Sequence, residues 1–242
     1  MMEPGAFRYL DQFLFIALPY LAFAVFFIGT IQRYRMQSFT YSSLSSQLLE
    51  NKQHFWGLVP FHYGILAVLT GHIVAFAIPR AVLAWNGQPL RLYILEVSGL
   101  ICGMLAFVGL VAAIVRRLRY PKIRMVTTIP DWIVFAMLLF QIGSGIYVAV
   151  FVGWGSAWFA AAATPYLRSL LFFSPDISYL SGMPWMVRLH IIDAFLLIGF
   201  FPFTRLVHVL VVPNMYLWRR PQVVRWNWNR HEIRRVDQGG KH

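Results

Sequence analysis

Cysteine is almost absent from this chain, since Cys102 is the only one among 242 residues. A single cysteine excludes an intramolecular disulfide, and the chain has no Cys-x-x-Cys-His motif for covalent attachment of a c-type haem. An iron–sulfur cluster held by cysteines of this chain is excluded for the same reason. Any redox centre bound here must therefore use other ligands.

Charge is also scarce. Only 12% of the residues are charged and 59% are hydrophobic, whereas an average soluble domain has about 25% charged residues. Five continuous apolar runs are long enough to cross a bilayer, which takes roughly 20 residues, and continuous runs disfavour the alternating pattern of a membrane β-barrel. We expect an all-α polytopic membrane helix bundle, one membrane domain over residues 1–242. The expected spans are about 13–31, 55–78, 91–115, 132–152 and 185–212.

Acidic residues are the rarest charged type, with nine Asp and Glu against 21 Lys and Arg. In a soluble protein such an excess would suggest nucleic acid binding. Here the basic residues gather in short segments (32–53, 116–124 and the tail 213–242), which is the pattern of cytoplasmic loops. The interpretation is an outside amino terminus and a cytoplasmic carboxyl terminus, with no nucleic acid partner.

Four histidines interrupt two of the apolar runs. His62 and His72 lie in the second expected span, and His190 and His208 in the fifth. Ionisable residues at membrane depth are costly and rare, so each indicates a functional site. At 1.5 Å per residue the first two are about 15 Å apart and the second two about 27 Å apart along a continuous helix. Eighteen residues are five whole turns, so His190 and His208 should share one helical face.

The expected topology determines how these histidines pair. The second span enters from the cytoplasm and the fifth from outside, so His72 should meet His190 near the outer face and His62 should meet His208 near the inner face. Tilt and a kink at Pro202 must absorb the difference of about 12 Å between the two separations. Two histidines fill both axial positions of a haem iron and favour electron transfer, whereas zinc takes three or four ligands together. We expect two haems b.

Other interpretations of these polar residues stay open. The four histidines could be hydrogen-bonded core residues, or part of a proton relay or transporter. Arg205, one turn before His208, could bind a propionate of the inner haem through a bidentate fork, or could be a snorkelling residue that marks topology. Arg188 could serve the outer haem in the same way, and Asp193 could orient a ligand or pack against another helix.

Several motifs around these histidines are similar to one known family. They are Phe-His-Tyr-Gly at 61–64, Gly-His at 71–72, Arg-Leu-His at 188–190, Phe-Pro-Phe-Thr-Arg-Leu-Val-His at 201–208 and the basic stretch 116–124. Together they resemble the gamma subunit of respiratory nitrate reductase, the dihaem cytochrome b membrane anchor, over about residues 9–225. The resemblance implies a multi-pass protein of a bacterial or archaeal inner membrane.

The resemblance also implies an activity and partners. Quinol would be oxidised near the outer haem, and electrons would pass to the inner haem and then to an iron–sulfur subunit on the cytoplasmic side. A molybdenum-containing catalytic subunit would reduce nitrate there. Gly71 matches the family's quinol-site glycine, and Arg91 is the nearest cation to the position of a quinol-site lysine. We therefore expect Gly71, His72 and Arg91 to border the quinol pocket.

Two alternatives to this function remain. One is a related dihaem cytochrome b of another complex, such as a sulfite- or heterodisulfide-reductase-like one, because nothing in this chain touches the terminal substrate. The other is a haem-free transporter or anchor. The latter predicts that all four histidines can be replaced without loss of a chromophore.

Overall fold

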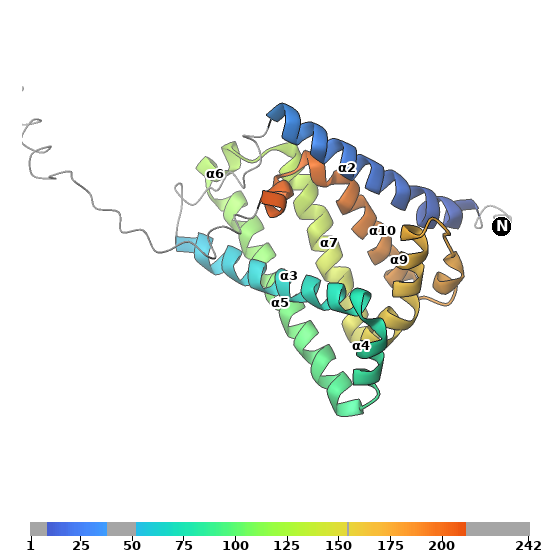
Figure 1. The fold of residues 1–242 in the computed structure, drawn as a ribbon. Coiled ribbons are helices and arrows are strands. Elements are labelled where there is room, and N and C mark those ends of the chain that lie inside the picture. Colours follow the sequence, from blue (N-terminus) through green and yellow to red (C-terminus); the bar gives the residue numbers. More distant parts are fainter. Residues whose placement is uncertain (1–8, 38–51, 154, 212–242) are drawn as a thin grey trace, which may run out of the picture. The chain divides into compact units, whose positions relative to one another are not determined.

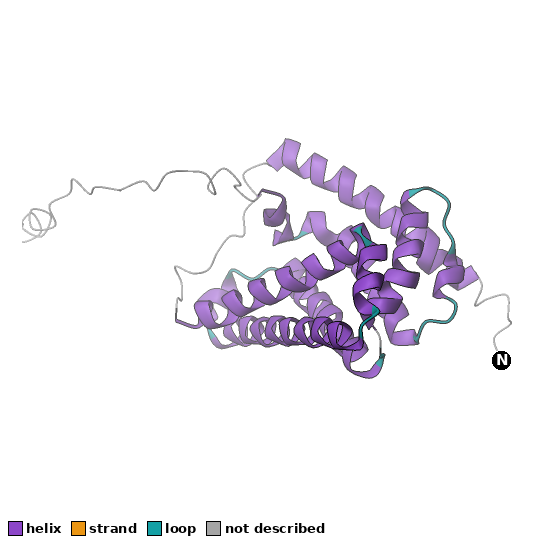
Figure 2. Ribbon diagram, turned by 60° about the horizontal axis from the view of Figure 1, so that its bottom comes forward, coloured by secondary structure: helices purple, strands orange, loops and turns teal. Residues whose placement is uncertain are grey.

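The computed structural model describes residues 9–37, 52–153 and 155–211. These residues are helical almost throughout, and no strand occurs among them (Figures 1 and 2). Five helices in this part of the chain are long and apolar enough to cross a membrane: Tyr9–Met36, Gly57–Ala77, Pro89–Arg119, Ile129–Phe151 and Trp185–Phe203. The expected all-α fold with five spans is confirmed. The basic tail 213–242 and most of the segment 32–53 lie outside the described residues.

The first span contains a change of helix type that a proline explains. A π-helical turn, η1 (Phe13–Ala17), leads into α2 (Leu18–Gln37). Pro19 has no N–H to donate to the carbonyl of Phe15, four residues earlier. The buried hydroxyl of Tyr166 donates to that carbonyl instead, at 2.8 Å. Tyr166 comes from the loop between the fourth and fifth spans, so it ties that loop to the first span.

The second and third spans pack backbone against backbone. They are α3 (Lys52–Ala77) and α5 (Pro89–Arg119), which lie side by side (Figure 1). A Cβ added at Gly64 would lie 2.5 Å from the backbone nitrogen of Ala106, and one at Gly109 would lie 2.4 Å from that of Phe61. Small residues allow such close approach of membrane helices. This contact positions the half of α3 that carries His62.

Short helices connect the spans. The expected connection after α3 is itself helical, as α4 (Pro79–Asn86). On the other face, α6 (Pro121–Met125) precedes α7 (Ile129–Phe151), whose start is capped by Thr128 and Asp131. The loop after α7 folds as α8 (Gly155–Trp158), π-helical η3 (Phe159–Ala163), α9 (Thr164–Leu171) and the 3-10 turn η4 (Ile177–Leu180). Its α9 and η4 parts pack into a core with the first and fifth spans, whereas α8 and η3 contact α4.

The fifth span is not one continuous helix, and it is interrupted at Pro202, where the sequence predicted a kink. The α-helix α10 is Trp185–Phe200, and two 3-10 turns follow, η5 (Phe201–Phe203) and η6 (Arg205–Val211). Pro202 removes a backbone donor and clashes with the preceding turn. The side chain of Arg33, on α2, donates to the carbonyls of Pro202 and Thr204 at 2.6 and 2.7 Å. The break is therefore held open by the first span.

Candidate functional site

The structure brings His62 and His208 together. His62 lies on α3 and His208 on η6, and their ring centroids are 6.5 Å apart. His208 lies beyond the break in the fifth span, so the helical face that His190 and His208 were expected to share does not exist. The bend at Pro202 and Thr204 sets the position of His208 instead of the tilt of a long helix.

Three of the four histidines have the same hydrogen bond at Nδ1. The Nδ1 atoms of His62, His72 and His208 lie 2.7, 2.9 and 2.6 Å from the backbone carbonyl oxygens of Leu58, Val68 and Arg205. A carbonyl oxygen only accepts, so each Nδ1 carries the proton and donates it. The lone pair of Nε2 is then available to a metal, which is the arrangement typical of metal-binding histidines.

The inner pair fits an ion held between two imidazoles. Metal–nitrogen bonds of about 2 Å place two opposed imidazole rings roughly 6 Å apart, centre to centre, close to the 6.5 Å seen here. Within the described ranges, no group of three or more His, Cys, Asp and Glu side chains could hold a metal ion. His62 and His208 would suit a haem iron, because two protein ligands are enough where a porphyrin supplies the others.

The outer histidines are held differently. His190, on α10, packs against α7, where a Cβ added at Gly145 would lie 3.2 Å from its Cε1. The Oγ of Ser144 lies 2.8 Å from His190 Nδ1, and its hydroxyl donates to the carbonyl of Gln141. It therefore accepts from Nδ1–H, which leaves Nε2 as an acceptor, and the Gln141 amide lies 3.1 Å from that atom. The sequence reasoning missed Ser144 and Gln141; the pattern Gln-Ile-Gly-Ser-Gly in the fourth span is the only signal for them.

His72 lies on the exposed side of α3, and its ring contacts Phe159 of η3 at 5.1 Å between centroids. Among the four histidines, the rings of His62 and His208 lie 6.5 Å apart between centroids, and the expected pairing of His72 with His190 stays a prediction.

Arg205 has a protein partner that the sequence did not reveal. Its Nε lies 3.0 Å from Oδ1 of Asp131, and its Nη2 donates to the carbonyl of Val126 at 2.8 Å. Asp131 is buried and also accepts from the backbone N–H of Thr128 at 2.9 Å. The expected role at a propionate therefore stays a prediction, while the observed contact anchors η6 to the start of α7.

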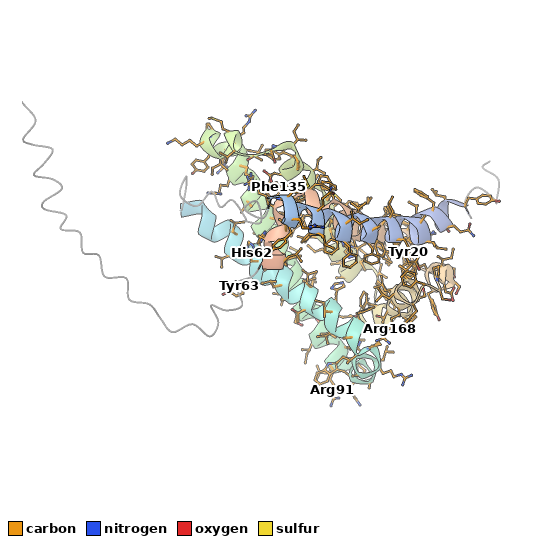
Figure 3. The ribbon with its side chains drawn as sticks, turned by 45° about the horizontal axis from the view of Figure 1, so that its top comes forward. Tyr20, His62, Tyr63, Arg91, Phe135 and Arg168 are labelled. Carbon is orange, nitrogen blue, oxygen red and sulfur yellow. The ribbon has the colours of Figure 1, made fainter. Side chains whose placement is uncertain are left out.

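The expected quinol-site residues lie on two elements. Gly71 and His72 are exposed on α3, and a Cβ added at Gly71 would meet nothing within 4 Å. Arg91 is exposed at the start of α5, and its guanidinium stacks over Trp85 of α4 at 5.0 Å from the ring centroid. Figure 3 shows Arg91 near the turn that joins α4 to α5.

A second cation, Arg168, was not among the expected site residues. Its Nη2 donates to the carbonyls of Phe76 and Ala77 at 2.9 and 3.2 Å, so it caps the end of α3 shortly after His72 (Figure 3). Its position as an isolated arginine in a nearly uncharged loop was the only sequence signal for this contact.

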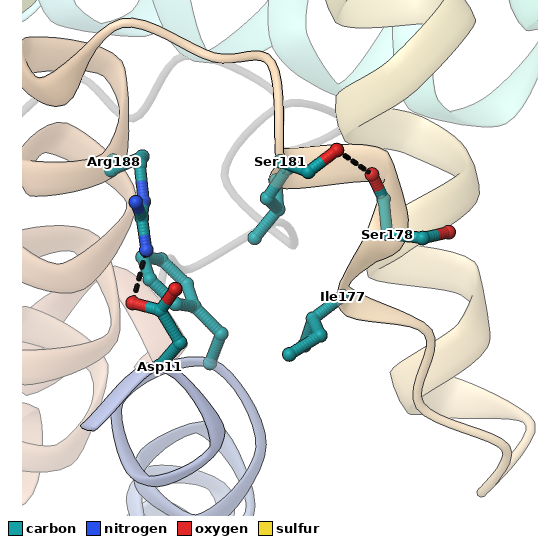
Figure 4. Close-up of a pocket in the computed structure, with 7 residues that line it drawn as sticks. Asp11, Ile177, Ser178, Ser181 and Arg188 are labelled. Carbon is teal, nitrogen blue, oxygen red and sulfur yellow. Dashed lines mark hydrogen bonds and ion pairs between the residues drawn. The ribbon is translucent and has the colours of Figure 1, made fainter. Parts of the chain in front are cut away.

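A small cavity of about 140 Å³ lies beside the start of α10 (Figure 4). Arg188 and Asp11 form an ion pair at its edge, and Ser178 and Ser181 of the loop after α7 line the opposite side. Arg188 thus joins the fifth span to the first. A role for Arg188 at the outer haem stays a prediction.

Taken together, the described elements form a multi-pass membrane protein with histidines on its second span, on α10 and on η6. This is the class of polytopic membrane proteins with functional ionisable residues in or beside their spans. More particularly, the chain belongs to the nitrate reductase gamma subunit family, whose model matches residues 11–227.

Curated relatives agree over nearly their whole length. The chain is 35% identical to the nitrate reductase gamma chain of Bacillus subtilis over 218 residues, which cover 88% of this chain and 97% of that one. It is 33% identical to the respiratory nitrate reductase 2 gamma chain of Escherichia coli over 234 residues, 90% of this chain and 98% of that one. The respiratory nitrate reductase 1 gamma chain of Escherichia coli is 32% identical with the same coverage.

The resemblance inferred from the sequence motifs is therefore confirmed. The chain is a multi-pass plasma membrane protein and the membrane anchor subunit of an oxidoreductase complex of the nitrate reductase type. Such a gamma subunit implies catalytic and iron–sulfur partner subunits.

Proposed function

We propose that the chain oxidises membrane quinol near the outer face and passes the electrons through two bis-histidine haems b to a cytoplasmic iron–sulfur subunit. The observation that carries the proposal is the arrangement of the four histidines. His62 and His208 are spaced for a shared ion, and three of the four histidines donate from Nδ1 to a backbone carbonyl. The fourth, His190, has its Nδ1 at hydrogen-bond distance from Ser144.

Each pair has one assigned haem. His72 and His190 would hold the outer haem and His62 and His208 the inner one, through Nε2. At His190 the amide of Gln141, now 3.1 Å from Nε2, would have to turn aside when the haem binds. When bound, each haem supplies reversible one-electron chemistry. The protein fixes the imidazole tautomers, excludes water with apolar helices, and holds the inner site through the ion pair of Arg205 with Asp131. Electrons thereby cross the membrane from the outer to the inner site.

Quinol enters where α3 is open to the lipid. Gly71 leaves space beside His72, and both residues are exposed on a span otherwise lined with apolar side chains. Arg91 offers a cation to an oxygen of the quinol head group. Quinol oxidation on the outer side releases protons outside while electrons move inward, so the reaction separates charge across the membrane.

The partners follow from the sidedness expected from the basic segments. The iron–sulfur subunit docks on the cytoplasmic ends of the helices, where α6 presents exposed Lys122 and Arg124. A molybdenum-containing subunit beyond it reduces nitrate. Membership of the nitrate reductase family favours nitrate over sulfite or a heterodisulfide as the terminal acceptor.

The test is reduction of the haems by a soluble quinol in the purified complex, followed by visible absorption. We expect two low-spin b-type haems per chain and their reduction by quinol in the wild-type complex. The Arg91→Ala variant should be slower, and Arg80→Ala, which removes an exposed arginine of the neighbouring α4, should react like the wild type. Unchanged kinetics in Arg91→Ala would remove Arg91 from the site, and absence of haem from folded wild-type complex would leave only a haem-free anchor or transporter.

A further inference from the structure

A polar cluster lies on three helices at the end of α3 that carries His72. The side-chain amide of Asn86, at the end of α4, donates to Ser156 Oγ at 3.1 Å. Ser156, in α8, donates in turn to Oε1 of Glu96, on α5, at 3.5 Å. Glu96 is an acidic residue within the third span, and a carboxylate at membrane depth marks a functional position.

The cluster contains polar atoms without partners. Asn86 is only 9% exposed, and its buried Oδ1 has no hydrogen-bond partner among the described residues. Trp158, two residues after Ser156, has a buried indole N–H that also has no hydrogen-bond partner in the part of the chain that the structure describes. Leaving such groups unpaired costs about 1–3 kcal/mol each, and a buried water with two to four polar partners is the usual remedy. One acceptor, one donor and a carboxylate thus form a site suited to water.

The cluster is connected to the proposed quinol site through the chain. Phe159, which contacts the ring of His72, follows Trp158 directly. Trp85 directly precedes Asn86, and the guanidinium of Arg91 stacks over the ring of Trp85. The residues that hold Glu96 are therefore sequence neighbours of those that contact His72 and Arg91.

We propose that Glu96, with Ser156, Asn86 and the water that they hold, receives the protons of quinol and releases them outside. This proposal rests on quinol oxidation at His72. Quinol becomes quinone by losing two electrons, which pass one at a time to the outer haem, and two protons. A quinol O–H bond breaks, its proton passes through water to the Glu96 carboxylate, and the carboxylic acid loses it to the outer aqueous phase. The second proton follows after Glu96 has been deprotonated again.

Few other ionisable groups compete for this role. The elements around Glu96 contribute Arg91 and Tyr93 from α5, Arg80 from α4, His72 from α3, Tyr147 from α7 and Arg168 from α9. The segments α8 and η3, which contact the cluster directly, contain no ionisable side chain. The arginines have no acceptor atom and cannot take up a proton, and the proposed ligand role of His72 occupies its Nε2.

The experiment compares Glu96→Gln with the wild type in the complete complex. A positioned proton acceptor contributes roughly 100-fold or more to rate. We expect quinol-driven haem reduction to slow by about that factor and to lose its dependence on pH, while haem content and dithionite-reduced spectra stay unchanged. Glu96→Asp should restore part of the rate, because a carboxylate is present again.

Two further variants separate a proton path from a structural role. Ser156→Ala removes the hydroxyl that joins Asn86 to Glu96. It should slow quinol-driven haem reduction and increase the solvent isotope effect on its rate. Ser98→Ala is the matched control, because this serine is on the same helix but bonds only its own turn at Leu95, and it should behave like the wild type. A wild-type rate and pH profile in Glu96→Gln would overturn this proposal while leaving quinol oxidation intact. Failure of wild-type complex to accept electrons from quinol would overturn both.

Discussion

Gly64 and Gly71 are two turns apart on α3, yet their surroundings are opposite. An added Cβ at Gly64 would lie 2.5 Å from the backbone of α5, whereas one at Gly71 would meet nothing within 4 Å. The helix α3 is thus packed tightly against α5 beside His62 and has free space beside His72. The difference indicates that α3 has room beside His72, but not beside His62, for a molecule from the lipid.

The histidines follow the same division. His62 and His208 are positioned by backbone geometry, through the glycine contact of α3 and the break that Arg33 holds at Thr204. His190 is positioned by side chains of α7, through Ser144 and Gln141. Substitutions should therefore act on the inner site through folding and on the outer site through its chemistry.

The largest expected effect comes from filling the tight contact of α3 with α5. Gly64→Val would place new atoms inside the backbone of α5, which costs more than about 3 kcal/mol because neither helix can move away. We expect loss of monodisperse protein in size-exclusion chromatography. Gly71→Ala is the matched control and should yield folded protein with both haems. Normal folding of Gly64→Val would show that the two halves of α3 are not packed differently.

The next effect tests the anchor of η6. Arg205→Ala removes the ion-pair partner of the buried Asp131 carboxylate, which costs about 3 kcal/mol. We expect a lower melting temperature and selective loss of the inner haem, seen as loss of one of two low-spin signals in electron paramagnetic resonance. Loss of the outer signal instead would contradict the placement of Arg205 beside the inner site.

A smaller and purely chemical effect is expected at the outer site. Ser144→Ala removes the hydroxyl that accepts from His190 Nδ1–H, which lowers the basicity of the imidazole and the affinity for the cofactor by about 10–100-fold. A less basic ligand stabilises oxidised iron less, so the midpoint potential of the outer haem should rise in a redox titration. The midpoint potential of the inner haem should not change. A shift in the potential of the inner haem alone would contradict the assignment of His190 to the outer haem.

The smallest effect concerns the tie between the loop after α7 and the first span. Tyr166→Phe loses the bond to the Phe15 carbonyl and should cost about 1–2 kcal/mol in unfolding free energy, with both haems retained. Burial, and secondarily Tyr20, raises the pKa of Tyr166 above its ordinary value of 10.0. The folded state thus favours the neutral phenol, and its contribution is present below pH 10 and declines above it. Thermal unfolding measured up to pH 11 should show a shallower alkaline loss in Tyr166→Phe, and an unchanged slope would contradict this role.

The sequence was sufficient for the features that are periodic or chemically unusual. Five apolar runs predicted five spans, and ionisable rings within two of them identified His62, His72, His190 and His208. Each of these residues is unusual within its own segment of the sequence, so no knowledge of contacts between segments was needed to find it.

Other features depend on contacts between distant segments. Pro202 predicted a disturbance, but its outcome as two 3-10 turns depends on Arg33, which lies 169 residues before Pro202. In the same way, the pairing of Arg205 with Asp131 and the contact of Ser156 with Glu96 join different helices. A polar residue shows its type in the sequence but not the partner that packing will bring to it.

The most direct test of the account is which histidines share a haem. Each of the four would be replaced by alanine in turn, and the two low-spin haem signals would be recorded by electron paramagnetic resonance, with haem quantified per chain. The account predicts that His62→Ala and His208→Ala lose one signal, and that His72→Ala and His190→Ala lose the other. Loss of the same signal in His62→Ala and His190→Ala would contradict it.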